Sequence, residues 1–145
     1  MGWSIPTILG WTRSKREARK LNYYHKQITF LYRDSKLDEN DIGPVNRLRS
    51  DIVDEYSKGK LNEKHYESLR NEISVLYKEI LKKRINALNN SNNLANEKTT
   101  EEQLAQIRDE VEYAYSEGKI NDKHYTLLNK AISNLDSKSE DKLFP

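Results

Sequence analysis

The sequence contains no cysteine, only three prolines and only five glycines among its 145 residues. Without cysteine the chain cannot build a disulfide framework, a thiolate metal site or a cysteine nucleophile. So few glycines and prolines exclude a turn-rich β-sandwich and a collagen-like chain. A helical fold remains, and the length is that of one domain.

Long apolar runs are also missing. The longest uncharged stretch is residues 1–12, well short of the roughly 20 residues that span a bilayer. The basic residues follow this stretch, whereas a secretory signal peptide has them in front of its apolar part. We therefore expect a cytoplasmic protein whose association with a membrane depends on this N-terminal segment.

Charge is abundant but unevenly spread. Charged residues make up 33% of the chain and apolar residues 35%, and the mean hydropathy is −0.97, so the core must be thin. Residues 1–37 carry eight basic and two acidic side chains, a net charge of +6, while the remainder carries 17 basic and 21 acidic ones, a net charge of −4. This asymmetry indicates either a basic arm for an anionic partner or a basic helix that lies on an acidic body.

Apolar residues recur at spacings of three and four along most of the chain, which predicts an all-α fold with five helices. The stripe of the first helix includes Tyr24 and Tyr32, so we expect both rings in the core. We divide the chain into an apolar N-terminal segment at 1–12, a basic helix at 13–37, a helical hairpin at 41–88, a linker at 89–99, a second hairpin at 100–136 and a frayed tail at 137–145.

The two hairpins are copies of one another. Residues 48–74 read LRSDIVDEYSKGKLNEKHYESLRNEIS, and residues 107–133 read IRDEVEYAYSEGKINDKHYTLLNKAIS. The offset is 59 with no gap, and 12 of the 27 aligned pairs are identical. An internal duplication of this kind predicts one structural unit used twice.

The turn of each hairpin has a physical explanation. A glycine can adopt positive φ and end the first helix, and an asparagine caps the second. An apolar residue before the cap and a tyrosine four residues after it have the spacing of a hydrophobic staple. These residues are Gly59, Leu61, Asn62 and Tyr66 in the first turn and Gly118, Ile120, Asn121 and Tyr125 in the second.

This pattern resembles the SHOCT family of short helical hairpins, whose core is an apolar helix, Gly, any residue, Ile, a capping Ser or Thr, acidic residues, and then Phe or Tyr. The match runs from Gly59 to Tyr66 and from Gly118 to Tyr125, so the resemblance covers less than half of the chain. Asn replaces the capping hydroxyl, and His replaces an acidic residue. The resemblance implies a non-catalytic module that mediates oligomerisation, often on membrane-associated proteins.

The sequence offers few candidates for catalytic or metal-binding residues. His65 and His124 are related by the duplication, but a zinc site needs three or four ligands, and the sequence has neither HExxH nor cysteine. Carboxylates alternate with lysines on helical faces, where i,i+4 pairs explain them. We predict no catalytic residue, no metal, no cofactor and no small-molecule substrate.

The N-terminal segment carries the sharpest functional signal. It contains two tryptophans, and basic residues follow at once, an order typical of a segment at the cytoplasmic face of a membrane. The alternative is that its apolar side chains fold back over the end of the bundle. The residues expected to contact a membrane or another anionic partner are Trp3, Ile8, Leu9, Trp11, Arg13, Lys15, Arg16, Arg19 and Lys20.

These observations predict two antiparallel hairpins packed as a four-helix, bundle-like core, with the basic helix as a fifth member. The function that fits is a non-catalytic interaction or oligomerisation module at the cytoplasmic face of a membrane, which binds a protein partner or itself. One alternative is a soluble protein that binds nucleic acid through the basic N-terminal helix. Another is a purely structural, self-associating bundle.

Overall fold

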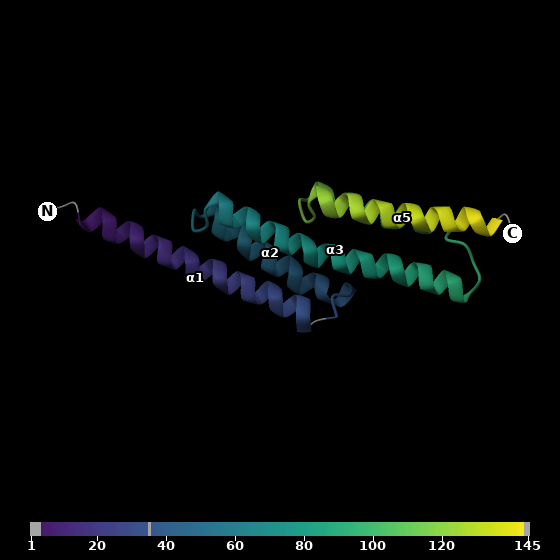
Figure 1. The fold of residues 1–145 in the computed structure, drawn as a ribbon, viewed down its shortest axis with the longest axis horizontal. Coiled ribbons are helices and arrows are strands. Elements are labelled where there is room, and N and C mark those ends of the chain that lie inside the picture. The colour runs from purple at the N-terminus through teal and green to yellow at the C-terminus, as the bar shows by residue number, and fades with distance from the viewer. Residues whose placement is uncertain (1–3, 35, 144–145) are drawn as a thin grey trace.

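The computed structural model describes residues 4–34 and 36–143, with side chains described for 14–34 and 36–136. Five α-helices and one short 3-10 helix account for most of them, and no strand occurs in this part of the chain (Figure 1). The predicted all-α class with five helices is confirmed. The elements are α1 (Ser4–Asp34), η1 (Glu39–Asp41), α2 (Ile42–Ser57), α3 (Glu63–Leu94), α4 (Glu101–Ser116) and α5 (Asp122–Leu143).

The sequence duplication is also a structural one. Adding 59 to the bounds of α2, 42 and 57, gives 101 and 116, which are the bounds of α4. Adding 59 to 63, where α3 begins, gives 122, where α5 begins. Both hairpin turns therefore have the same length and join their helices at equivalent residues.

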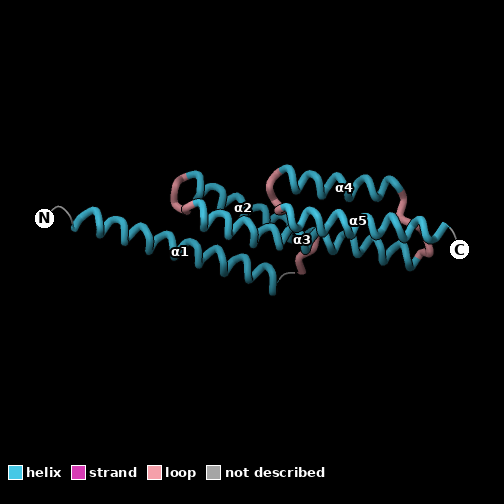
Figure 2. Tube along the Cα trace, turned by 45° about the horizontal axis from the view of Figure 1, so that its top comes forward, coloured by secondary structure: helices cyan, strands magenta, loops and turns pink. Residues whose placement is uncertain are grey.

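The helices pack in the expected bundle-like way, in an elongated form. The long helices α1, α3 and α5 run in the same direction, and each begins part-way along the one before it (Figures 1 and 2). Among the described residues, the backbones of α1 and α2 do not approach α4 or α5, while α3 packs against all four. Arg49 of α2 reaches the turn after α4 with its side chain. The molecule is thus an elongated pair of three-helix groups, α1–α2–α3 and α3–α4–α5, which share α3.

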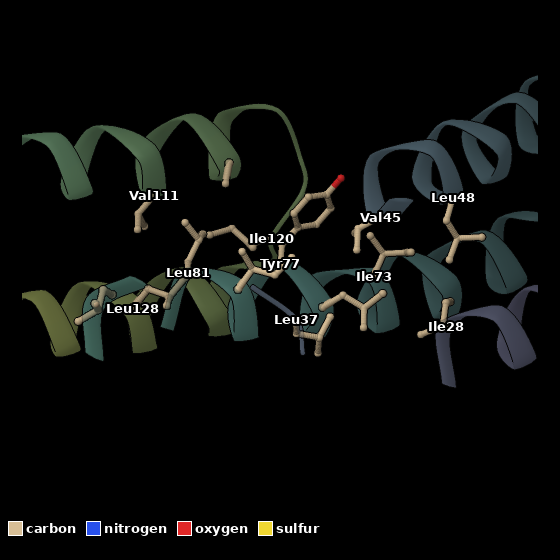
Figure 3. Packing of buried hydrophobic residues seen from close by; sticks show 14 of the residues in the cluster. Ile28, Leu37, Val45, Leu48, Ile73, Tyr77, Leu81, Val111, Ile120 and Leu128 are labelled. Atoms are coloured by element: carbon tan, nitrogen blue, oxygen red, sulfur yellow. The ribbon is translucent and has the colours of Figure 1, made fainter. Parts of the chain in front are cut away.

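The shared helix explains this arrangement. Nine residues of α3 are buried, from Leu69 to Asn92, so both halves of the helix face a core. Figure 3 shows Ile73 near residues of α1 and α2, and Leu81 near residues of α4 and α5. The labelled neighbours are Ile28, Val45 and Leu48 around Ile73, and Val111 and Leu128 around Leu81.

The expected linker at 89–99 is shorter in the structure, because α3 continues to Leu94. One residue of this polar run, Asn92, is buried, and its Nδ2 donates to Thr99 Oγ1 at 3.0 Å. Thr99 precedes Thr100, which caps α4 in a reciprocal capping box with Gln103. The contact between Asn92 and Thr99, across the turn, therefore stabilises the last turns of α3, although asparagine has a low helix propensity.

Both ends of the chain are more helical than expected. The break predicted between 12 and 13 is absent, because α1 begins at Ser4 and runs unbroken to Asp34. The N-terminal part of α1 extends past the turn between α2 and α3 (Figure 1). At the other end, α5 continues to Leu143 through the segment expected to fray. The structure gives residues 4–12 and 137–143 a helical backbone, whereas composition alone favoured an irregular one.

The two tyrosines of the α1 stripe have different surroundings. Tyr24 is buried at 6% exposure, whereas Tyr32 is 53% exposed, so the expectation that both lie in the core is wrong for Tyr32. Eight residues turn an α-helix by about 80° beyond two full turns, which carries Tyr32 away from the core face. The neighbouring Leu31 packs against the core instead.

Alanine substitutions at three glycines should differ in effect. Gly59 and Gly118 both have φ 74°, so alanine there should lower the free energy of unfolding by about 1–2 kcal/mol. Gly43 has open space around it but is the second residue of α2 and precedes Pro44, whose ring crowds a helical side chain before it, so Gly43→Ala should stay within about 0.5 kcal/mol of the wild type. Urea unfolding of the three variants measures this, and a neutral Gly118→Ala would contradict the turn geometry.

Candidate functional site

The first hairpin turn is held to α1 by a three-residue clasp. Asn62 caps α3, its side-chain oxygen accepting from the backbone N–H of His65 at 2.8 Å. The backbone N–H of Asn62 itself donates to Glu17 Oε1 of α1 at 2.5 Å. The same carboxylate oxygen lies 2.9 Å from Nδ1 of His65. We call Glu17, Asn62 and His65 the first clasp.

The second turn has a clasp at the equivalent place. Asn121 caps α5 and accepts from the backbone N–H of His124 at 2.9 Å. The backbone N–H of Asn121 donates to Ser74 Oγ of α3 at 2.9 Å, and Ser74 Oγ lies 2.5 Å from His124 Nδ1. We call Ser74, Asn121 and His124 the second clasp. Each clasp ties the start of one long helix to the long helix before it.

The clasps affect the titration of their members. Burial alone would raise the pKa of Glu17, but the hydrogen bonds from Asn62 and His65 outweigh it, and the pKa is lowered from 4.5. Burial, with Lys78 and Lys123 nearby, lowers the pKa of His124 from 6.5. The first site therefore favours a charged carboxylate and the second a neutral imidazole.

The turns carry a second repeated feature, a pair of stacked tyrosines. Tyr56 and Tyr66 stack at 4.0 Å between ring centroids, and Tyr115 and Tyr125 stack at 4.1 Å. Leu61 and Ile120 beside them are buried at 3% exposure each. The apolar residue of each turn thus joins the core, while the tyrosine of the predicted staple stacks on a ring from the preceding helix.

Three cations gather at the second turn. Arg49 donates to the carbonyl oxygen of Glu117 at 2.6 Å, and Arg70 to that of Gly118 at 3.5 Å. Lys119 lies over the rings of Tyr77 and Tyr113, and burial and Arg49 lower its pKa. These cations face the carbonyl end of α4, where the helix dipole favours positive charge. Their arrangement is explained by capping of that helix end.

A different kind of surface lies along α1. Six exposed side chains follow one another at spacings of 3, 4, 3, 4 and 3 residues, which places them on one side of the helix. Four are basic and two are aromatic, and the two aromatic rings, Tyr23 and Phe30, are 57% and 59% exposed. We call this set the outer face of α1; its members are Arg16, Arg19, Tyr23, Lys26, Phe30 and Arg33.

Charge is segregated between the two sides of α1. From residue 14 to residue 33 its one acidic side chain is Glu17, which belongs to the first clasp. On the core side, Lys20 pairs with Glu55 at 2.8 Å and His25 with Glu72 at 2.7 Å. Burial raises the pKa of Tyr24 to about 12, and the carboxylates of Glu55 and Asp51 add to the effect.

The acidic body thus neutralises only the core side of the basic helix. The structure shows no ion pair between the four cations of the outer face and any other described side chain. Of the predicted contact residues, Arg16 and Arg19 lie on the outer face, whereas Lys20 pairs with α2. Lys15 is exposed beside them.

The remaining predicted contact residues are beyond the described side chains. Trp3 lies outside the described residues, and only the helical backbone is described for Ile8, Leu9, Trp11 and Arg13. Sequence reasoning missed Tyr23, Lys26, Phe30 and Arg33 as parts of the same face. Their heptad-like spacing from Arg16 was the signal that could have found them.

The second clasp places the Ser74 hydroxyl beside the His124 imidazole, but both side chains are buried, and neither lines the hollow next to that turn. No helix within 4–34 and 36–143 is long and apolar enough to cross a bilayer. Comparison of the chain with protein-family models, curated proteins and solved structures finds no match. The likeness of the turns to SHOCT hairpins therefore stays a motif-level resemblance.

Proposed function

We propose that this chain is a non-catalytic interaction module that docks on an anionic membrane surface through the outer face of α1. The observation that carries the proposal is the composition of that face: four cations and two exposed aromatic rings, with no carboxylate among its six members. Cations near an anionic leaflet contribute about 1 kcal/mol each to binding. Aromatic rings between them can enter the interface.

The shape of α1 fits a flat partner such as a membrane surface. The outer face is one side of a straight helix that protrudes from the rest of the molecule (Figure 1). A helix that lies in a membrane interface likewise places one side against the lipid. In the sequence the same spacing continues back from Arg16 through Thr12, Leu9 and Ile5, towards the two tryptophans. A partner contact could thus extend over most of α1.

Charge reversal on the outer face should weaken membrane binding by at least about 30-fold, because two cations at about 1 kcal/mol each are lost. We would compare the wild type with Arg16→Glu/Arg19→Glu. Vesicles of phosphatidylcholine with 30% phosphatidylserine serve as the probe, with phosphatidylcholine alone as reference. The emission of Trp3 and Trp11, the two tryptophans of the chain, reports binding.

The matched control is Lys98→Glu/Lys130→Glu, which makes the same change in net charge at exposed positions away from α1. This variant should bind the anionic vesicles nearly as well as the wild type. Equal weakening by both variants, or no binding by the wild type, would overturn the proposal. Tight binding of a single-stranded oligonucleotide without vesicle binding would overturn it in favour of nucleic acid.

A further inference from the structure

The two clasps match in position but differ in the charge of the group that holds the histidine ring. A backbone N–H can only donate, so Glu17 and Ser74 both accept from the capping asparagines. The ionised Glu17 has no proton to give, so Nδ1 of His65 must donate to it. The Ser74 hydroxyl can either donate to Nδ1 of His124 or accept from it, so the second clasp holds its ring through a neutral group.

The surroundings of the two rings reinforce the difference. His124 is 7% exposed, and the charged groups that face it are Lys78 and Glu79 of α3 and Lys123 of α5 itself. Burial and the two lysines disfavour a charged ring, and Glu79 opposes them only in part. The side chain of His65 is 31% exposed and lies against a carboxylate.

The two imidazoles lie beside partners of different charge. His65 lies beside the carboxylate of Glu17. His124 lies beside a neutral hydroxyl in a buried site near Lys78, so a proton on this ring puts a poorly compensated charge there. The second clasp therefore disfavours protonation of its histidine.

We propose that the paired clasps make the docking of α4 and α5 onto α3 acid-sensitive, while the group of α1, α2 and α3 stays closed. The connection at 95–100 is the hinge, and Leu81 and Ile85 of α3 are among the apolar side chains that opening would uncover. The device is independent of membrane docking, because it uses neither the outer face of α1 nor a lipid.

The pH range follows from the directions of the shifts. The pKa of His124 is lower in the folded state than its ordinary 6.5, so the unfolded or undocked chain binds the proton first. Docking therefore weakens as the pH falls below about 6.5. The lowered pKa of Glu17 means that the first clasp is lost only as the pH falls below about 4.5. Between these limits only the second clasp should loosen.

Native-state hydrogen exchange at pH 7.5 and pH 5.5, corrected for the intrinsic exchange rate, tests the device. Protection of the first turns of α5 should fall by at most about tenfold per pH unit, the limit for one proton. The first turns of α3 should keep their protection. NMR titration of the His124 ring should show a midpoint below 6.5 that coincides with the changes in the α5 amides.

The duplication supplies the matched pair of variants. His124→Gln should lower the protection of α5 at pH 7.5 and remove its pH dependence, and His65→Gln should leave that pH dependence intact. An α5 response that persists in His124→Gln, or an equal loss of protection in α3, would overturn the proposal. So would a wild-type ring that titrates at or above 6.5, and this last measurement needs no variant to fold.

Discussion

Replacing Leu69 by alanine should lower the free energy of unfolding by about 2–5 kcal/mol, the range for a fully buried leucine. Leu69 lies in the first half of α3 with no exposed surface, so the deleted methyl groups would leave a cavity in the α1–α2–α3 core. The loss combines the transfer free energy of the removed atoms with the cost of that cavity. Urea unfolding followed by circular dichroism gives the difference.

The repeat again provides partners for comparison. Leu128 is the equivalent of Leu69 at the offset of 59 and is 2% exposed, so Leu128→Ala should cost a similar amount in the second core. Its neighbour Leu127 is 49% exposed, and Leu127→Ala should stay within about 0.5 kcal/mol of the wild type. A Leu69→Ala variant as stable as Leu127→Ala would contradict the assignment of Leu69 to the core.

Local features of the fold could be predicted from the sequence because their causes lie within a few residues. The glycine, the apolar residue and the asparagine of each turn act inside one short segment, and the helices show the period of their apolar residues. The duplication then extended each inference from one hairpin to the other. These sequence patterns depend on residues close together in the chain, and the structure has helices at the positions that they predict.

The clasps could not be predicted, because their partners are far apart in the sequence. Glu17 lies 45 residues before Asn62, and Ser74 lies 47 residues before Asn121. Glu17 is the one acid in residues 14–33, but no local pattern shows which distant group it contacts, and the same holds for Ser74. The histidines were noticed only because they are repeated, and repetition does not reveal what a side chain contacts.

The offset between the two helix groups corresponds to a pattern of apolar residues in α3 that can be interpreted only once the structure is known. Along α3 the buried residues Leu69, Ile73, Leu76 and Ile80 form one stripe, and the buried residues Ser74, Tyr77, Leu81 and Ile85 form a second stripe beside it. One residue turns the helix by about 100°, so the second stripe gives α3 a second buried face. A helix with a single apolar face packs into one bundle, whereas α3 has two buried faces and packs into both helix groups.

A proline in the middle of α3 tests whether this shared helix couples the two groups. Lys82→Pro removes the hydrogen bond to the carbonyl of Lys78 and should cost about 3 kcal/mol or more. Lys82 is exposed, so the substitution removes no core contact, and Lys82→Ala controls for the lost side chain. The larger effect should be on cooperativity, because α3 is the one described helix that packs in both groups, and Arg49 adds only a side-chain contact from α2 to the second turn.

Repeats that touch only their neighbours unfold as one unit only when the interface between them is strong. In the wild type, amides of α2 and α4 should therefore exchange with the same free energy of opening. In Lys82→Pro the two values should separate, because the kink breaks the one element that both groups share. If α2 and α4 still exchanged with equal free energies in Lys82→Pro, coupling would have to run through contacts other than a continuous α3. The architecture of two groups on one helix would then fail as an account of stability.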